Sequence, residues 1–319
     1  MKPLNLLCIT PIDSIGDLKQ RMESKFALTY VPDPGENDLA EFPETDVIFT
    51  NPNKSKVFLG EKSLNSLPKL KAITTASTGT VHIDQGYCAS RNVTILSIKK
   101  EISTLENITS TAELAFGLTL AGVRNLIPAA TSTLQGYWDY EPFVGRQLNG
   151  LTIGCVGFGR LGKMYARFAK SFSQNVLVCD PFKESQIIDA DFESVGLKQL
   201  FVHSDVISLH IHAEGNEKII DRECLNWAKD NLVLVNTSRG EIVDESALID
   251  VMERKRGVKY MTDVLDGEIY GTSSNVLLAY ARENMDRVVV TPHIGGMCSD
   301  AQILAYGRAF DMLCEYCNY

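Results

Sequence analysis

The fold of this chain is decided by LTIGCVGFGRLGK, residues 151–163. The stretch opens with an apolar run typical of a buried strand and continues in a helical pattern. Gly157, Gly159 and Gly162 lie between the two, in the spacing G-x-G-x-x-G. This spacing predicts a tight turn at Gly157, close approach of the backbone to a bound pyrophosphate at Gly159, and close helix–strand packing at Gly162. Unpaired amides at the start of the helix favour such an anion.

A carboxylate marks the end of the next apolar run. Asp180 follows Asn175–Cys179 and lies 18 residues after Gly162. A carboxylate in this place accepts hydrogen bonds from the ribose hydroxyls of adenosine and repels a 2′-phosphate, so NAD is favoured over NADP. The nearby Lys183 is a single basic residue and does not reverse that preference. The alternative is a glycine-rich turn in a nucleotide-free α/β fold, with Asp180 solvated.

Short apolar runs alternate with helical patterns along the whole chain. From residue 151 onward there are six such runs, the number of a full dinucleotide-binding fold: LTIGCVGFG, NVLVCD, VISLHI, LVLVNTS, VKYMTDV and RVVVTPH. The first hundred residues contain five: LNLLCIT, FALTYV, TDVIFT, LKAITTAS and VTILSI. Helical segments such as Ile15–Ser24 and Ser63–Leu67 lie between them. This alternation predicts an α/β protein with two doubly wound parallel-sheet domains.

The length of 319 residues also suits two domains. We expect residues 1–100 and 295–319 to form one discontinuous domain, because the last piece is about one helix long, and residues 101–294 to form the nucleotide-binding domain. The segment TSTAELAFGLTLAGVRNLI, residues 109–127, predicts one long helix. Its opening Thr and Ser residues, followed by Glu113, have the pattern of a capping box.

Composition excludes several classes of function. Hydrophobic residues make up 45% and charged residues 22%, as in ordinary globular proteins, and the net charge of -9 leaves no basic face for a nucleic acid. The sequence contains no run of about 20 apolar residues, so we expect no membrane partner. Cys314 and Cys317 are the one suggestive pair among eight scattered cysteines, and without nearby ligands they predict no metal site. We interpret the cysteines as reduced and the protein as cytoplasmic.

Three polar residues follow later apolar runs. Arg239 follows LVLVNTS, Glu268 comes after VKYMTDV, and His293 lies in TPHIGG, residues 291–296. Because ligands bind beyond the carboxyl ends of the strands of a doubly wound sheet, we expect the three to face one crevice. Arginine binds a carboxylate through two hydrogen bonds, histidine exchanges a proton near neutral pH, and a carboxylate beside it favours the protonated ring. The alternatives are a surface arginine, a loop acid and a structural histidine.

In their order, these motifs resemble those of the D-isomer-specific 2-hydroxyacid dehydrogenase family, which contains phosphoglycerate, glycerate and D-lactate dehydrogenases. The resemblance covers residues 70–319 and rests on LNGLTIGCVGFGRLG, VCDPF, VISLHI, VNTSRGEIVDESAL, DVLDGE and TPHIGG. It implies a flavodoxin-like substrate domain and a Rossmann NAD-binding domain. It also implies hydride transfer between NAD(H) and a small D-2-hydroxy acid or its 2-oxo acid.

The resemblance implies roles for single residues as well. Arg239 would bind the substrate carboxylate, His293 would donate or accept the proton, and Glu268 would orient the imidazole. In ASTGTVHID, the backbone amides of Thr78 and Gly79 would help to hold the substrate carboxylate. The residues implied in cofactor binding are Gly157, Gly159, Arg160, Leu161, Gly162, Asp180, His210, Thr237, Asp263 and Gly295. Asp263 would lie near the nicotinamide.

Some positions depart from the family's pattern. His212 and Ile269 stand where proline is usual, and IYGTSSNVLLAYAREN, residues 269–284, is an unusual segment, so we expect an unusual substrate preference. Two other interpretations stay open: a non-catalytic NAD(H)-sensing binding protein on the same fold, and a formate dehydrogenase, which usually pairs the histidine with glutamine. Residues 109–127 and the loop with Trp138 resemble the family's dimerisation segment, so we expect a homodimer.

Overall fold

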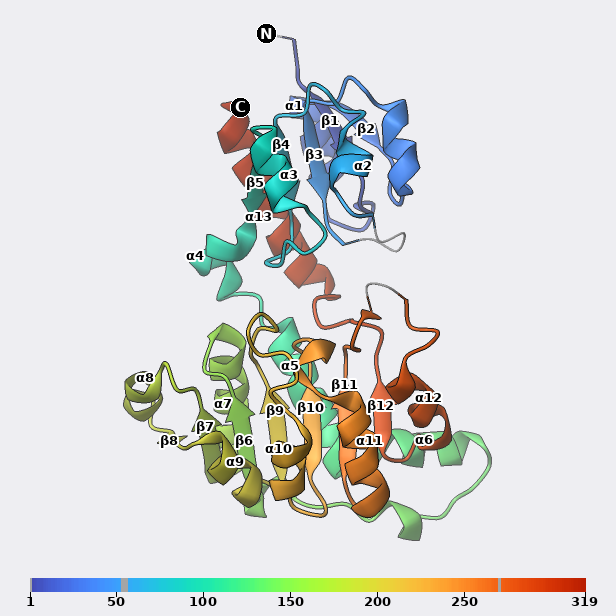
Figure 1. Cartoon of the computed structure of the whole chain (residues 1–319), viewed down its shortest axis with the longest axis vertical. Helices are drawn as coiled ribbons and strands as arrows, with labels where there is room; N and C mark the ends of the chain where they lie inside the picture. Colours follow the sequence, from blue (N-terminus) through green and yellow to red (C-terminus); the bar gives the residue numbers. More distant parts are fainter. Residues whose placement is uncertain (1, 53–56, 269–270) are drawn as a thin grey trace. The chain divides into compact units, whose positions relative to one another are not determined.

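The structure, a computed structural model, describes residues 2–52, 57–268 and 271–319. It divides into two compact units. Unit 1 comprises Met1–Ile108 and Met297–Tyr319, and unit 2 comprises Thr109–Gly296. Each unit contains one parallel β-sheet with helices on its faces (Figure 1). The predicted α/β class with two parallel sheets is therefore confirmed.

Unit 1 contains a five-stranded sheet in the order β2-β1-β3-β4-β5. All five strands predicted from the sequence are present: β1 (Asn5–Cys8), β2 (Ala27–Tyr30), β3 (Val47–Thr50), β4 (Ala72–Thr75) and β5 (Thr94–Ser97). The order is that of flavodoxin-like folds. The helices of this unit are α1 (Leu18–Lys25), α2 (Glu61–Leu64), α3 (Gln85–Ser90), α4 (Ile102–Leu105) and α13 (Ser299–Cys317), with the 3-10 turns η1 (Glu36–Glu41) and η2 (Ile98–Lys100).

Two apolar clusters cover the two faces of this sheet. Successive strand residues point to opposite faces, so Leu6 contributes to one cluster and Leu7 to the other. Phe310 and Leu313 of α13 are buried in the first cluster. The C-terminal helix thus packs on a sheet whose strands all lie in the first hundred residues.

Unit 2 contains a seven-stranded sheet in the order β12-β11-β10-β9-β6-β7-β8. Its strands are β6 (Thr152–Val156), β7 (Asn175–Cys179), β8 (Glu193–Ser194), β9 (Val206–Leu209), β10 (Val233–Asn236), β11 (Lys259–Thr262) and β12 (Val288–Val290). The prediction of six strands missed β8, because two polar residues show no apolar run. Numbered within the unit, the order 3-2-1-4-5-6-7 is that of a Rossmann fold.

Helices cover both faces of this second sheet (Figure 1). One face packs against α5 (Ser110–Val123) and α7 (Arg160–Phe172) through one apolar cluster. The other packs against helices on the opposite side through a second cluster. These helices are α9 (Leu197–His203), α10 (Arg222–Trp227), α11 (Glu245–Arg254) and α12 (Val276–Glu283). The unit also contains α6 (Leu126–Leu134), α8 (Glu184–Asp189) and the 3-10 turns η3 (Glu141–Phe143), η4 (Leu148–Gly150) and η5 (Gly240–Ile242).

The helix predicted over residues 109–127 begins where expected but ends earlier. It stops at Val123, because Asn125 has a left-handed φ of 54° and Lys259 donates to the carbonyl of Gly122 at 3.0 Å. The predicted capping box does not form. The N-cap residue is Thr109, and its hydroxyl donates to the carboxylate of Glu113 instead of accepting a backbone N–H.

A second helix, α6, begins directly after this break and was not predicted. Pro128 is its third residue, a first-turn position where the missing N–H costs no helical hydrogen bond. Within the part of the chain that the structure describes, no single helix is long and apolar enough to cross a membrane. One bent pair, Ile102–Val123 with Leu126–Leu134 at 66°, meets the length and composition requirement jointly.

Candidate active site

The candidate site lies at the carboxyl ends of the unit 2 strands. All strand pairs in this sheet are parallel, so the residues that follow the strands gather at one edge. Strand order reverses between β6 and β9, and open α/β sheets bind ligands beside such a switch point. The segments that follow β6, β9, β10, β11 and β12 contain nearly all of the predicted site residues.

The glycine-rich turn after β6 has the geometry of a dinucleotide cradle. Gly157 has a φ of 94°, and a Cβ there would lie 2.5 Å from the carbonyl oxygen of His210. A Cβ on Gly162 would lie 2.0 Å from the carbonyl oxygen of Gly157, so both positions require glycine. A Cβ on Gly159 would meet no protein atom within 4 Å. This open space precedes the first turn of α7, formed by Arg160 and Leu161, where helical amides attract an anion.

Asp180 connects the end of β7 to this turn. Its Oδ2 accepts the backbone N–H of Phe158 at 2.9 Å, and its Oδ1 accepts that of Phe182 at 3.1 Å. Each carboxylate oxygen can accept a further hydrogen bond, which is the capacity that ribose hydroxyls require. Lys183 donates to the carbonyl oxygen of Phe158 at 3.2 Å. This contact directs its ammonium group at the backbone of the turn.

His210 and Thr237 follow β9 and β10. The Nε2 of His210 lies 2.9 Å from the hydroxyl of Ser208, and its ring packs on Tyr165 with centroids 4.9 Å apart. Burial lowers the pKa of His210 to about 3, so the ring is neutral. His210 Nδ1 and Thr237 Oγ1 are buried and have no hydrogen-bond partner within the described chain. His210 also packs against Gly157 and Gly162 of the glycine-rich turn, and orphaned polar atoms of this kind fit a site that a polar ligand completes.

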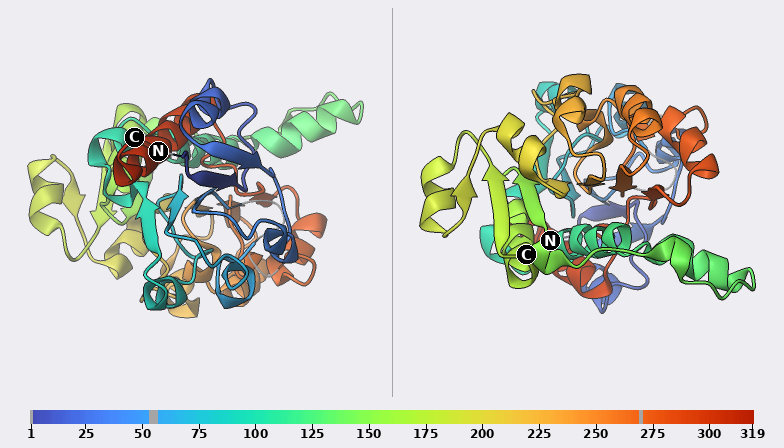
Figure 2. Two further views of the ribbon diagram at one scale, coloured as in Figure 1. Left: turned by 90° about the horizontal axis from the view of Figure 1, so that it is seen from above. Right: turned by 90° about the horizontal axis from the view of Figure 1, so that it is seen from below.

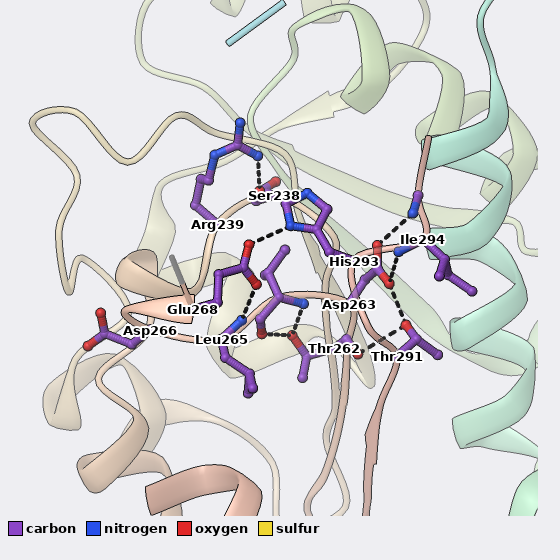
Figure 3. Close-up of polar contacts among 12 residues, drawn as sticks. Ser238, Arg239, Thr262, Asp263, Leu265, Asp266, Glu268, Thr291, His293 and Ile294 are labelled. Carbon is purple, nitrogen blue, oxygen red and sulfur yellow. Dashed lines mark hydrogen bonds and ion pairs between the residues drawn. The ribbon is translucent and has the colours of Figure 1, made fainter. Parts of the chain in front are cut away.

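The ring of His293 faces the carboxylate of Glu268 (Figure 3). His293 Nδ1 is hydrogen-bonded to Glu268 Oε1, and Glu268 Oε2 accepts the backbone N–H of Leu265 at 3.1 Å. The His293 side chain is 49% exposed and that of Glu268 is 22% exposed. Because Nδ1 is hydrogen-bonded to Glu268, Nε2 is the ring atom that can exchange a proton with a ligand.

Electrostatics favour the charged forms of this pair. The hydrogen bond from His293 to Glu268, with the negative charge of that carboxylate, raises the pKa of His293 against the opposing effects of burial and of Arg239. Burial alone would raise the pKa of Glu268. The hydrogen bond and positive charge of His293, the Leu265 amide and the charge of Arg239 outweigh it and lower that pKa. A histidine in this state is a good proton donor near neutral pH.

Arg239 lies beside the pair after β10 (Figure 3). One guanidinium nitrogen donates to the carbonyl oxygen of Ser238 at 2.7 Å. Gly240, the next residue, packs so closely on the loop after β11 that a Cβ would lie 1.9 Å from the carbonyl carbon of Leu265. The arginine and the loop that carries Glu268 are therefore positioned together.

Asp263 has a role that sequence reasoning missed. The residue is buried, with 1% of it exposed. Its Oδ1 accepts the hydroxyl of Thr291 and the backbone N–H of Ile294, and its Oδ2 accepts the N–H of Gly295 at 2.7 Å. These bonds clamp the TPHIGG loop on both sides of His293, whose φ of 55° is left-handed and uncommon for histidine. The only sequence signal was an acid directly after a buried strand.

The remaining predicted positions belong to other segments of the chain. Thr78 and Gly79 belong to unit 1, in the loop after β4, where the hydroxyl of Ser77 donates to the carbonyl oxygen of Gly79 at 2.5 Å. His212 follows β9, and its carbonyl oxygen accepts the side-chain amide of Asn216 at 3.0 Å. Ile269, the other position where the family usually has proline, lies outside the described residues.

Comparison with known proteins points to one family. Residues 116–295 match the family described as D-isomer specific 2-hydroxyacid dehydrogenase, NAD binding domain. The chain is 31% identical over 269 residues to a hydroxypyruvate reductase of Thermotoga maritima. The aligned residues make up 82% of this chain and 81% of that protein. It is 32% identical to a D-3-phosphoglycerate dehydrogenase of Mycobacterium tuberculosis over 267 residues, an alignment that includes 83% of this chain. The chain spans only 48% of that longer relative.

Solved structures agree with the sequence relatives. A D-lactate dehydrogenase from Aquifex aeolicus, complexed with NAD and lactic acid, is 25% identical and has a TM-score of 0.78. The alignment covers 98% of this chain and 95% of that one. The similarity therefore extends over both units and is not confined to the nucleotide-binding half.

Proposed function

Since the chain belongs to the D-isomer-specific 2-hydroxyacid dehydrogenase family, we propose that Arg239, Glu268 and His293 are the residues with which it interconverts a 2-hydroxy acid and a 2-oxo acid. The reaction class is NAD-dependent oxidoreduction. The single observation that carries the assignment of residues is the hydrogen bond between His293 and Glu268 beside Arg239.

Each side chain has a task that follows from its chemistry. Arg239 binds the substrate carboxylate, because a guanidinium group can donate two parallel hydrogen bonds to it. His293 donates the Nε2 proton to the carbonyl oxygen of a 2-oxo acid during reduction and accepts it from the hydroxyl group during oxidation. Glu268 orients the imidazole and keeps it protonated for reduction. The bound nicotinamide supplies or accepts the hydride.

The cofactor is NAD, and several features of unit 2 fit it. We propose that the glycine-rich turn and the first turn of α7 hold the pyrophosphate, that Asp180 accepts the ribose hydroxyls, and that the orphaned polar atoms of His210 and Thr237 face the cofactor. By resemblance, Asp263 lies close to the nicotinamide, Gly295 contacts the cofactor, and the backbone amides of Thr78 and Gly79 in unit 1 hold the substrate carboxylate. Unit 1 is then the substrate domain.

One experiment tests the reaction and the residues together. NADH consumption is followed with purified protein against a panel of 2-oxo acids that includes hydroxypyruvate, pyruvate and phosphorylated and sugar-derived acids, with His293→Ala and Glu268→Gln as variants. We expect at least one acid to be reduced by the wild type and the rate to collapse in both variants. NADH binding without reduction of any acid would contradict the proposal and favour a non-catalytic NAD-sensing role.

We also propose that the protein is a homodimer and that it works in the cytoplasm. Support for a dimer comes from large apolar side chains exposed on α6 and the following loop, among them Leu134 and Trp138 at 90% and 91% exposure. Figure 2 shows α6 in green, extending away from the seven-stranded sheet of its own unit. A surface of this kind is typical of a protein interface. Support for the cytoplasm comes from the eight cysteines, all of which lie among the described residues and are free.

A further inference from the structure

A second carboxylate lies beneath the loop that carries Glu268. Glu245 is the first residue of α11, and only 5% of it is exposed, which is rare for an acid. Its Oε1 accepts the backbone N–H of Asp266 at 2.9 Å, and its Oε2 accepts the side-chain amide of Asn275 at 2.8 Å. Asn275 also donates to the carbonyl oxygen of Asp266 at 3.3 Å. The buried carboxylate therefore joins three segments: α11, the loop after β11 and the start of α12.

The contacts of Glu245 converge on the peptide bond between Leu265 and Asp266. Glu245 accepts the N–H of this peptide, and Gly240 packs against its carbonyl carbon. The preceding N–H, that of Leu265, donates to Glu268 itself. A movement of this peptide would therefore shift the carboxylate of Glu268 relative to His293.

Glu245 is not needed to begin the helix. The N-cap of α11 is Asp244, whose Oδ1 accepts the backbone N–H of Ala247 at 3.0 Å. Burial raises the pKa of Glu245 and outweighs its hydrogen bonds to Asp266 and Asn275, which lower that pKa. Desolvation of a carboxylate opposes folding, and two converging N–H donors offset that cost only while the loop keeps its position.

We propose that Glu245 is a positioning residue for the Glu268–His293 pair, acting through the Leu265–Asp266 peptide and assisted by Asn275. Its effect on the imidazole is independent of turnover, whereas its effect on rate rests on the function proposed above. Asn275 lies in the segment that departs from the family's pattern. This segment therefore contributes, through Glu245 and Asp266, to the position of the Glu268 carboxylate.

A reciprocal pair of substitutions separates this role from simple packing. In Glu245→Gln, a glutamine has one acceptor oxygen for two donors, so one N–H group faces another. In Glu245→Gln/Asn275→Asp, the new carboxylate accepts a hydrogen bond from the glutamine amide. It can also still cap α12, because the N–H of Leu278, which donates to Asn275 in the wild type, can donate to the aspartate. Asp250→Asn changes an exposed acid of the same helix and is the matched control. Asn275→Ser keeps a capping residue, removes the amide donor and serves as the milder variant if Glu245→Gln does not fold.

The first readout is the titration of His293, followed by NMR in protein labelled with ¹⁵N-histidine and assigned with His293→Ala. We expect the midpoint in Glu245→Gln to move to lower pH, toward that of Glu268→Gln, because the Glu268 carboxylate is displaced from its hydrogen bond with His293 Nδ1. Asn275→Ser should move it less, and Asp250→Asn should leave it unchanged. The double variant should reverse most of the shift, because it lacks only the hydrogen bond to the carbonyl oxygen of Asp266. An unchanged midpoint in folded Glu245→Gln or Asn275→Ser overturns the proposal.

The second readout is kinetic. We expect kcat for the best 2-oxo acid to fall roughly 10- to 100-fold in Glu245→Gln with the dissociation constant of NADH unchanged, and to recover in the double variant. A loss of kcat that the double variant does not recover, with the His293 midpoint unmoved, reduces Glu245 to a packing residue and overturns the proposal. If the wild type reduces no acid, the function proposed above fails, but the NMR titration still decides the role of Glu245.

Discussion

His293 Nδ1 is hydrogen-bonded to the carboxylate of Glu268, 25 residues earlier in the chain, although the two follow different strands. Strands β11 and β12 are parallel neighbours, so the segments after them meet at the same edge of the sheet. The pair depends on this adjacency and on the Asp263 clamp that holds the TPHIGG loop. The proton-transfer chemistry of the protein follows from the state of this pair.

The pH dependence of the reaction should report the pKa of His293. Reduction requires the protonated ring, so kcat/KM for a 2-oxo acid should be constant at low pH and fall as pH rises through the pKa, which Glu268 raises above the ordinary histidine value of 6.5. Oxidation requires the neutral ring, so kcat/KM for the 2-hydroxy acid should rise as pH rises through the same pKa. In Glu268→Gln both limbs should move to lower pH. Limbs that stay in place would show that another group titrates.

Two glycines of the same turn should respond differently to alanine. Gly162→Ala places a Cβ 2.0 Å from a backbone oxygen, so we expect a loss of about 1–3 kcal/mol in the free energy of unfolding, measured with urea. Gly159→Ala meets no protein atom and should leave that free energy nearly unchanged. It should instead weaken NADH binding roughly 10-fold or more, about 1.4 kcal/mol, because the methyl group occupies the pyrophosphate space. Equal effects of both variants on stability would contradict this division.

The clamp at Asp263 should matter for stability as well as activity. Asp263→Asn leaves one acceptor oxygen for three donors, and an unsatisfied buried donor costs about 1–3 kcal/mol. We expect this loss in urea unfolding, together with a lower kcat, because the left-handed His293 is no longer held. Thr291→Val removes only one donor and is the control, with a smaller loss. Full stability of Asp263→Asn would show that the clamp is dispensable.

Cofactor preference should depend on Asp180. Asp180→Ser removes the charge that repels a 2′-phosphate, so the ratio of kcat/KM for NADH to that for NADPH should fall by about 10-fold or more. Lys183 should not by itself support NADPH use, because its ammonium group donates to the backbone of Phe158. Asp189→Asn, an exposed acid of α8, is the control. An unchanged ratio would place cofactor selection elsewhere.

The proposed dimer can be tested by the mass of the particle in solution. Light scattering at micromolar concentration should give twice the mass of 35.3 kDa for the wild type. Leu134→Asp combined with Trp138→Ala should give the single-chain mass, because it places a charge within the exposed apolar surface. Met285→Ala, another exposed apolar residue of unit 2, should leave the mass unchanged. A wild type with the single-chain mass would refute the dimer.

Much of the fold could be predicted because burial leaves a periodic pattern. Each predicted strand of unit 1 appears, and strands such as β1 and β3, which are buried on both faces, read as nearly continuous apolar runs. β8 escaped prediction because Glu193 and Ser194 are polar and pair at the sheet edge. The end of α5 escaped it too, because Leu126 and Ile127 resume the apolar pattern after Asn125, and only the fold brings the distant Lys259 to Asn125 where the helix ends.

The order of strands and helices, the glycines of the turn and the set of polar residues after the strands could be predicted, because each is a local property of spacing and residue type. Which of the polar groups meet depends on tertiary contacts. The Asp263 clamp and the burial of Glu245 join residues about 20 to 30 positions apart, and no local pattern encodes such a distance. Their geometry arises when parallel strands place successive loops side by side, where buried carboxylates must find donors.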